Sequence, residues 1–372
     1  NIDIYTAKID YEQPFYKGKL GFGGKITDVK TKNTFDFYDV YGNVPVKDIG
    51  LSNRFNYDEN VKALYVNYNR PLSKKTTIQA GVRMENTSSE GDLISVIPQP
   101  DDTVKRSYTN FFPSGAITYT LNQKNTLNLS YSRRIDRPGY QDLNPFENKL
   151  DELTYRKGNA FLNPQYTNSF QLSHTFLYKY VTSISYSHIK DFFAQIIDTV
   201  QNKSFITQKN IAQQNIFSLN FSAPVTITKW WNSFVTFSGY HSAYKADFGA
   251  GKKINANVDA YSLFTQQSFT VKKGPTFELS GFYNSPSVWG GTFKSSAIGS
   301  LDIGVQQKVL KSAGTIKVSY TDILNTLHWR GISDYGGAHL DASGHFESQQ
   351  LKINFSYRFG NKLVKAARQR KA

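Results

Sequence analysis

The stretch LKINFSYRFG, residues 351–360, alternates strictly between two kinds of side chain. Each odd position from Leu351 to Phe359 is apolar or aromatic, and each even position from Lys352 to Arg358 is polar. Successive side chains of a β-strand point to opposite faces, so this pattern predicts a strand with one apolar and one polar face. The same period recurs in SFQLSHTFLY, residues 169–178, and in TIQAGVRME, residues 77–85.

Two kinds of connection separate the alternating runs. Short connections carry lysine, as in PFYKGK and PLSKK, whereas longer ones are polar or rich in glycine, at roughly residues 39–57, 90–106, 135–165, 246–254 and 331–345. The runs number about fifteen, and most exceed the roughly ten residues that a tilted strand needs to cross a bilayer. We therefore predict an all-β fold, a transmembrane antiparallel up-and-down β-barrel with its short turns at the periplasm.

Composition excludes several other classes of protein. The chain has 372 residues, of which 15% are aromatic, and one Met. No window approaches the ~18 consecutive apolar residues of a transmembrane helix. The absence of cysteine rules out disulfides, thiolate metal sites and cysteine nucleophiles. The net charge of +15 is spread over short connections and the C-terminal tail, so nucleic acid is not an expected partner.

The direction of the strands predicts a larger barrel. If the lysine connections are periplasmic, the first and last strands both end at the periplasm, and the number of strands is odd. Bacterial single-chain barrels have even numbers. We therefore expect further strands ahead of Asn1, with residues 1–360 forming the C-terminal portion of a barrel and residues 361–372 a basic periplasmic tail.

Three long segments carry a family resemblance: YSRRIDRPGYQDLNPF (131–146), GNAFLNPQYTNSFQLSHTF (158–176) and FSYRFGNKLVKAARQRK (355–371). They resemble the outer-membrane β-barrel family of Bacteroidetes, which is of the TonB-dependent receptor type. The resemblance implies an integral protein of the Gram-negative outer membrane. It also implies a barrel of about 22 strands with a plug inside it, and these residues contain neither a plug nor an energising-protein box.

The function implied by this resemblance is binding and import of an external solute of the siderophore, oligosaccharide or peptide class. The implied partners are outer-membrane lipid and lipopolysaccharide, the barrel-assembly machinery, a TonB-type energising protein, and a surface lipoprotein or other complex subunits. The alternative is a non-transporting barrel subunit of an outer-membrane assembly, secretion or surface-protein complex. We expect no enzyme activity, cofactor or metal, because HExxH, GxSxG and histidine pairs at metal spacing are absent.

Charged residues on the polar phase are the candidate ligand contacts. Arg83 and Glu85 lie on the polar phase of the strand at residues 77–85. Pro138-Gly139 ends a second charged strand, which contains Arg134, where the chain enters the longest loop. The candidates are Arg83, Glu85, Arg134, Asp136, Arg137 and Tyr140. The alternative is a salt-bridged corner that fixes the loop, which we consider the better interpretation.

The tryptophans and the last strand suggest further roles. Trp230, Trp231, Trp289 and Trp329 lie near predicted strand ends, so we expect them in the aromatic girdles at the membrane interface, with sugar stacking as the alternative. Phe355, Tyr357 and Phe359 resemble the signal that the barrel-assembly machinery reads. His339 and His345 flank Asp341 in a glycine-rich stretch, which we interpret as a solvated loop rather than a metal site.

Overall fold

The computed structural model describes residues 1–96, 102–200, 203–210, 213–247, 253–289, 291–335 and 338–359. Strands make up most of these ranges, and their helical segments are α1 (Tyr140–Leu143) and the 3₁₀ turn η1 (Leu310–Ser312). No helix in the described ranges has the length and apolar character to cross a membrane.

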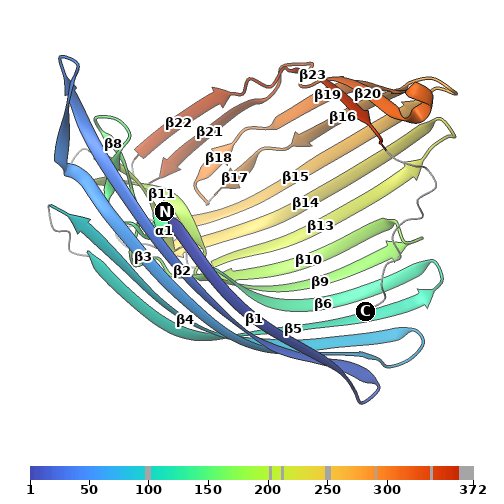
Figure 1. The fold of residues 1–372 in the computed structure, drawn as a ribbon, viewed down its shortest axis with the longest axis horizontal. Coiled ribbons are helices and arrows are strands. Elements are labelled where there is room, and N and C mark those ends of the chain that lie inside the picture. The colour runs from blue at the N-terminus through green and yellow to red at the C-terminus, as the bar shows by residue number, and fades with distance from the viewer. Residues whose placement is uncertain are drawn as a thin grey trace.

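Fifteen strands form one antiparallel sheet, called the wall below, in which each strand pairs with the wall strands before and after it (Figure 1). The wall strands are β1 (Ile2–Phe15), β2 (Gly18–Tyr41), β3 (Val44–Pro71), β4 (Thr76–Ser95), β5 (Thr103–Asn122), β6 (Asn125–Asp136), β9 (Gln165–Phe176), β10 (Tyr180–Lys190), β13 (Gln213–Thr226), β14 (Trp231–Asp247), β15 (Lys253–Thr270), β16 (Thr276–Asn284), β19 (Ile298–Val309), β20 (Gly314–Tyr320) and β23 (Leu351–Tyr357). The prediction of an all-β, up-and-down antiparallel sheet of about fifteen strands is confirmed.

Short turns join the wall strands at one end, called the turn end. Tyr16 and Lys17 form the first of them, with φ of 43° and 62°. The lysine connections identified from the sequence all lie at this end, including Lys124 between β5 and β6 and Lys311 within η1 between β19 and β20. Lysine suits such tips because its ammonium group stays in water while the strands on either side pair.

The opposite end, called the loop end, carries two small sheets (Figure 1). One consists of β7 (Glu147–Lys149), β8 (Thr154–Lys157), β11 (Phe193–Val200) and β12 (Lys203–Asn210). The other consists of β17 (Ser287–Trp289), β18 (Phe293–Ser295), β21 (His328–Tyr335) and β22 (Ala338–His345). Each small sheet combines two connections that are far apart in the sequence, so the loops pack on one another.

Three connections predicted as long polar loops are mostly strand. β2 and β3 run through nearly all of residues 39–57 and are joined by a turn at Gly42 and Asn43, whose φ are 54° and 68°. Similarly, β4 reaches Ser95 and β5 begins at Thr103. Residues 331–345 lie largely in β21 and β22, so His339, Asp341 and His345 stand on a strand and not in the predicted solvated loop. The first prediction was wrong because alternating residues flank Gly42-Asn43, and a Gly-Asn pair in that setting is a hairpin signal.

The two faces of the wall differ as the alternation predicts. On the outer face, Leu129 of β6 lies between its cross-strand neighbours Ile117 and Leu172, and all three are largely exposed. On the inner face, a packed cluster lies towards the loop end, where β11 lies against β14 and β15. This cluster consists of Ala194, Tyr244, Ala246, Ile254, Val258 and Ala260. Burial of apolar side chains on the inner face therefore holds the loops against the wall. The apolar side chains of the outer face point away from the protein.

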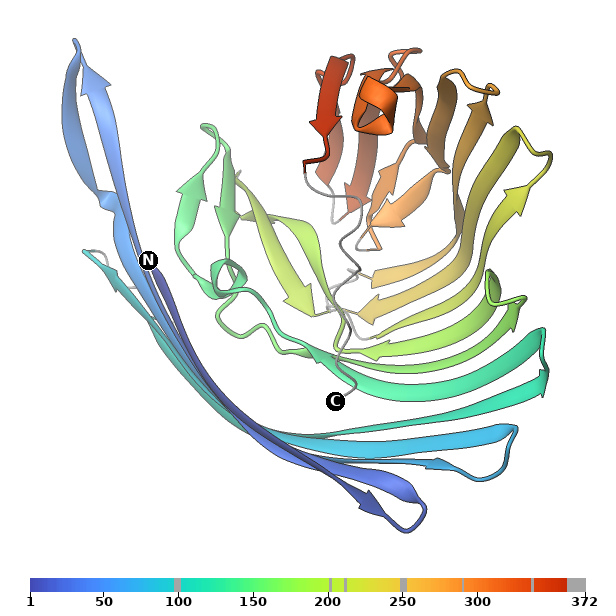
Figure 2. The ribbon, with the colours of Figure 1, turned by 45° about the vertical axis from the view of Figure 1, so that its right-hand side comes forward.

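The wall curls into an open trough with β1 and β23 at its rims (Figure 2). Within the described residues, β1 pairs only with β2, and β23 only with β20. A closed barrel of about 22 strands stays a prediction, and the two open edges support it because lipid cannot satisfy unpaired backbone groups. The predicted basic tail, residues 361–372, lies outside the described residues.

Candidate functional site

A buried ion cluster on the inner face of the wall joins three of the predicted site residues. Glu85 of β4 is 8% exposed, and its carboxylate accepts hydrogen bonds from Arg83 Nε at 2.5 Å and from an Arg137 guanidinium nitrogen at 2.6 Å. Arg137 also donates to Thr87 Oγ1 at 2.9 Å. Burial opposes the charge of Arg137, but Glu85 outweighs it and raises the pKa of the guanidinium. The cluster ties the loop after β6 to β4.

The other predicted ligand contacts do not join this cluster. Asp136 accepts a hydrogen bond from Gln165 Nε2 at 3.2 Å, and Tyr140 accepts one from Gln141 Nε2 at 3.0 Å. Arg134 is exposed. The geometry around Arg137 is that of the salt-bridged corner, and a role in ligand contact stays a prediction for all six residues.

The long loop after β6 is held inside the trough. Arg106 of β5 is partly buried and donates hydrogen bonds to the carbonyl oxygens of Ala160 and Leu162. Leu162 is fully buried. The two hydrogen bonds from Arg106 and the burial of Leu162 hold this loop against the inner face of the wall. The loop therefore narrows the lumen at the loop end.

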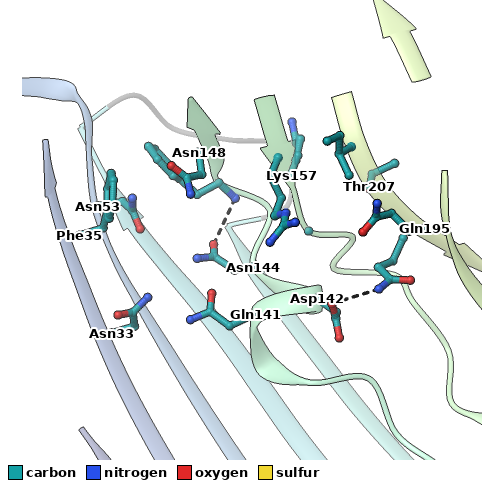
Figure 3. A pocket seen from close by; sticks show the side chains of 15 residues that line it. Asn33, Phe35, Asn53, Gln141, Asp142, Asn144, Asn148, Lys157, Gln195 and Thr207 are labelled. Carbon is teal, nitrogen blue, oxygen red and sulfur yellow. Dashed lines mark hydrogen bonds between the residues drawn. The ribbon is translucent and has the colours of Figure 1, made fainter. Parts of the chain in front are cut away.

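A cavity of about 280 Å³, the amide cavity, lies between the inner face of β2 and β3 and the loop segments that carry α1, β7, β8 and β12. Figure 3 shows several of its side chains directed into the same space from different elements. Seven of its lining residues are amides: Asn33, Asn53, Gln141, Asn144, Asn148, Gln195 and Gln208. An amide group offers both a hydrogen-bond donor and an acceptor, so the cavity is polar with little net charge.

Three charged residues line the amide cavity, and two of them have close partners. Asp142 accepts hydrogen bonds from the Gly139 backbone N–H at 3.1 Å and from Gln208 Nε2 at 3.3 Å. Lys157 Nζ lies 3.2 Å from a carboxylate oxygen of Glu147. Arg156 also lines the space and is exposed. The cavity therefore suits a ligand that is recognised mainly by hydrogen bonds rather than by charge.

A larger cavity of about 960 Å³, the aromatic cavity, lies on the other side of the β11–β12 hairpin. Eight of its lining residues are aromatic: Phe192, Phe193, Tyr240, Tyr261, Trp289, Phe293, Trp329 and Phe346. Gln195 and Gln208 line both cavities, and they are direct cross-strand partners in the hairpin. The two cavities therefore meet at this pair of glutamines.

The four tryptophans occupy two different settings. Trp230 and Trp231 lie at the turn end of β14, where both rings contact Phe269 of β15, with centroids 6.1 and 5.6 Å away. An interface role stays a prediction for this pair. In contrast, Trp289 and Trp329 lie on the β17 and β21 hairpins, outside the wall, and line the aromatic cavity. Their position differs from the predicted girdle because these connections fold over the trough and form their own sheet.

Histidines and acids near the loop end form ion pairs. His339 Nδ1 lies 2.5 Å from Asp334 Oδ1, a hydrogen bond that raises the pKa of the imidazole. Asp341 is bonded twice to the Arg330 guanidinium, at 3.1 and 2.6 Å. Among the residues that the structure describes, no three His, Cys, Asp or Glu side chains are grouped as metal ligands would be.

Sequence reasoning missed the amide cavity altogether. Its amides come from the β2–β3 hairpin, the segment from α1 to β7 and the β11–β12 hairpin, and these three parts of the chain share no sequence motif. Asparagine and glutamine are common in turns and on lumen-facing strand positions, so their frequency gave no signal. Only the inward folding of the loops brings them together.

The family of the chain follows from a match that spans almost all of the wall. Residues 1–357 match the model of the outer membrane protein beta-barrel family. The chain belongs to this family. Its membership places the fifteen-stranded wall in the outer membrane as an integral protein, with the exposed apolar face of the family's strands in contact with lipid.

Solved structures of the same fold are longer than this chain. The copper transporter OprC shares 11% identity with a TM-score of 0.69, covering 96% of this chain and 57% of that one. The ferric-catecholate import receptor Fiu from E. coli, in its closed form, shares 11% identity with a TM-score of 0.67, covering 96% and 55%. The ferric yersiniabactin uptake receptor FyuA from Yersinia pestis shares 12% with a TM-score of 0.66, covering 96% and 54%. The chain thus spans about half the length of each of these structures. A search of the curated proteins found no match.

The barrel architecture of the family assigns the two ends. Barrels of the outer membrane have short turns at the periplasm and long loops outside the cell, so the turn end is periplasmic and the loop end is external. Phe355, Tyr357 and Phe359 then lie on the last wall strand and just after it, near the periplasm, with Tyr357 and Phe359 in ring contact at 4.6 Å. Their reading by the assembly machinery stays a prediction.

A pair of substitutions tests which face of this family member meets lipid. Leu129, 50% exposed, is the central outward residue of β6, and Leu129→Arg is expected to lower the free energy of unfolding in lipid vesicles by about 2–4 kcal/mol. Ser130→Arg places the same charge on the inner face and is expected to have little effect. Equal destabilisation by both, measured by denaturant titration, would contradict the assignment of the faces.

Proposed function

We propose that this barrel binds an external solute at its loop end and imports it through its lumen. The observation that carries the proposal is that the external loops fold into the trough and enclose the amide and aromatic cavities there. A receptor needs such a site, whereas a purely structural wall does not need loops held over its lumen by buried contacts. The import receptors and transporter of the same fold support this proposal.

Import would require binding and movement but no covalent chemistry. The solute would bind first among the amide and aromatic side chains of the loop end. It would then pass along the polar inner face, where Arg83, Glu85 and Arg137 stand below the loops. As in the receptor type that the sequence resembles, a TonB-type protein would supply the energy by pulling on a plug, and a surface lipoprotein would be a plausible companion. Assembly would depend on the barrel-assembly machinery.

Growth tests separate import from a role as a complex subunit. A deletion strain is grown on single carbon sources and under iron limitation, with the full-length gene restored as the control. We expect a growth defect confined to one nutrient class, and the same defect in a strain that lacks the energising protein. Unchanged growth on every medium, together with co-purification of partner proteins in equal amounts, would instead establish the non-transporting subunit.

A further inference from the structure

We propose that the amide and aromatic cavities form one binding site for an oligosaccharide, which crosses the β11–β12 hairpin at Gln195 and Gln208. The inference rests on the proposed function, since it names the class of solute received at the loop end. It is carried by three features of the described residues: an unsatisfied buried amide, the joining of two cavities, and a lining with few free charges.

The unsatisfied amide is Asn53 of β3. Its side chain is 7% exposed and lines the amide cavity, yet neither Nδ2 nor Oδ1 has a hydrogen-bond partner in the described residues. Leaving such a buried group unpaired costs about 1–3 kcal/mol, so the position is unfavourable until something fills it. A hydroxyl group both donates and accepts, and therefore satisfies either atom of this amide.

The cavity offers further unpaired amides. The structure gives the side chains of Asn33, Asn148 and Gln195 no hydrogen-bond partner in the described residues, and all three face the same space as Asn53 (Figure 3). Phe35 and Phe146, whose ring centroids are 6.3 Å apart, supply an apolar surface beside them. Several donors and acceptors around a small apolar surface match a sugar ring, which carries hydroxyl groups at its edge and C–H groups on its faces.

The joining of the cavities indicates more than one ring. The amide cavity, at about 280 Å³, is near the lower limit of about 300 Å³ for ligand pockets. It therefore accommodates one terminal unit of a longer ligand. Beyond the glutamine pair, the aromatic cavity presents the indoles of Trp289 and Trp329, large flat surfaces on which further rings can stack.

Charge disfavours an anionic siderophore or a metal complex. Arg330, the cation lining the aromatic cavity, is bonded to Asp341 through two nitrogens, and Lys157 is paired with Glu147. Among the described lining residues Arg156 is a single cation without an ion pair, whereas a cluster of free cations is the usual device for binding carboxylate or phosphate groups. Most of the remaining lining in the two cavities consists of side-chain amides, hydroxyl groups and aromatic rings.

The test measures binding by the purified full-length protein in detergent, independently of growth. The probes are an array of defined neutral and acidic oligosaccharides, a tripeptide library and ferrichrome. We expect binding of an oligosaccharide with quenching of tryptophan fluorescence. Asn53→Leu is expected to weaken it at least tenfold without lowering the melting temperature, because an apolar side chain removes two unpaired buried atoms. Trp329→Ala is expected to weaken binding similarly.

Matched controls carry the same residue types at other places. Asn86, on the outward phase of β4, is bonded to Thr109 Oγ1 at 3.0 Å, and Trp230 lies at the turn end. Asn86→Ala and Trp230→Ala should bind as the wild type does. The proposal is overturned if no oligosaccharide binds, or if binding is unaffected by both Asn53→Leu and Trp329→Ala. Binding of tripeptides or ferrichrome alone would overturn it too, while leaving the import function intact.

Discussion

Replacing Glu85 with alanine is expected to lower the free energy of unfolding by about 3–5 kcal/mol, the usual effect of removing one partner from a buried ion pair. Glu85 is 8% exposed and is the shared acceptor for Arg83 and Arg137. Without it, two guanidinium groups face each other across a partly buried space. The change is to be measured by thermal and denaturant unfolding of the protein in detergent or lipid vesicles.

Two further variants separate charge from packing. Glu90 lies on the same strand and pairs with Lys105 at 2.9 Å, but both side chains are largely exposed, so Glu90→Ala should leave stability nearly unchanged. Glu85→Gln keeps the shape and loses the charge, and should fall between the wild type and Glu85→Ala. If Glu85→Ala and Glu90→Ala had equal effects, the buried cluster would not hold the loop after β6 to the wall.

Asp322→Ala is expected to lower the free energy of unfolding by about 1–3 kcal/mol. Asp322 is fully buried just beyond the external end of β20. Its carboxylate accepts hydrogen bonds from the backbone N–H groups of Thr326 and Leu327, at 2.9 and 3.2 Å, and from Ser348 Oγ at 2.5 Å. These three donors belong to exposed or half-buried residues, so water replaces part of what they lose, and the loss stays within the range of about 1–3 kcal/mol for one buried group.

Asp151, an aspartate exposed to water, provides the control for Asp322. Asp151 also accepts two backbone hydrogen bonds, from Leu153 and Thr154 at 2.9 and 2.8 Å, but it is exposed. In the Asp151→Ala variant, water takes the place of the carboxylate as the acceptor for these two N–H groups. The substitution should therefore hardly change the unfolding midpoint. Equal losses in both variants would show that burial of Asp322 is not the cause.

The contribution of Asp322 should also depend on pH. Burial raises the pKa of its carboxyl group, but the hydrogen bonds from Ser348, Thr326 and Leu327 outweigh burial and hold the pKa below its ordinary value. A carboxyl group with a lowered pKa in the folded state stabilises fully above its unfolded pKa of about 3.9 and loses this effect as the pH falls through the folded pKa. The difference between wild type and Asp322→Ala should therefore shrink below about pH 4.

Much of the wall was predictable because its cause is local. Alternation along TIQAGVRME placed Arg83 and Glu85 on the inner face, where both lie, and lysine tips marked the turn end. The corner at Arg137 was half predictable. Pro138-Gly139 ends β6 as expected, but the partner of Arg137 is Glu85, 52 residues earlier in the chain. Strand phase predicts a face, and it does not predict which neighbour a long side chain reaches.

By itself, the sequence determined the period of the strands, the two faces of the wall and the positions of its short turns. These follow from the two-residue repeat of the extended chain and from the few residues around each turn. Only the tertiary structure decided where Asn53, Gln195 and Trp329 lie, because each stands on a different connection or strand. Their meeting depends on loops folding into the trough and packing against residues such as Tyr244, and no repeat along the chain encodes such long-range contacts.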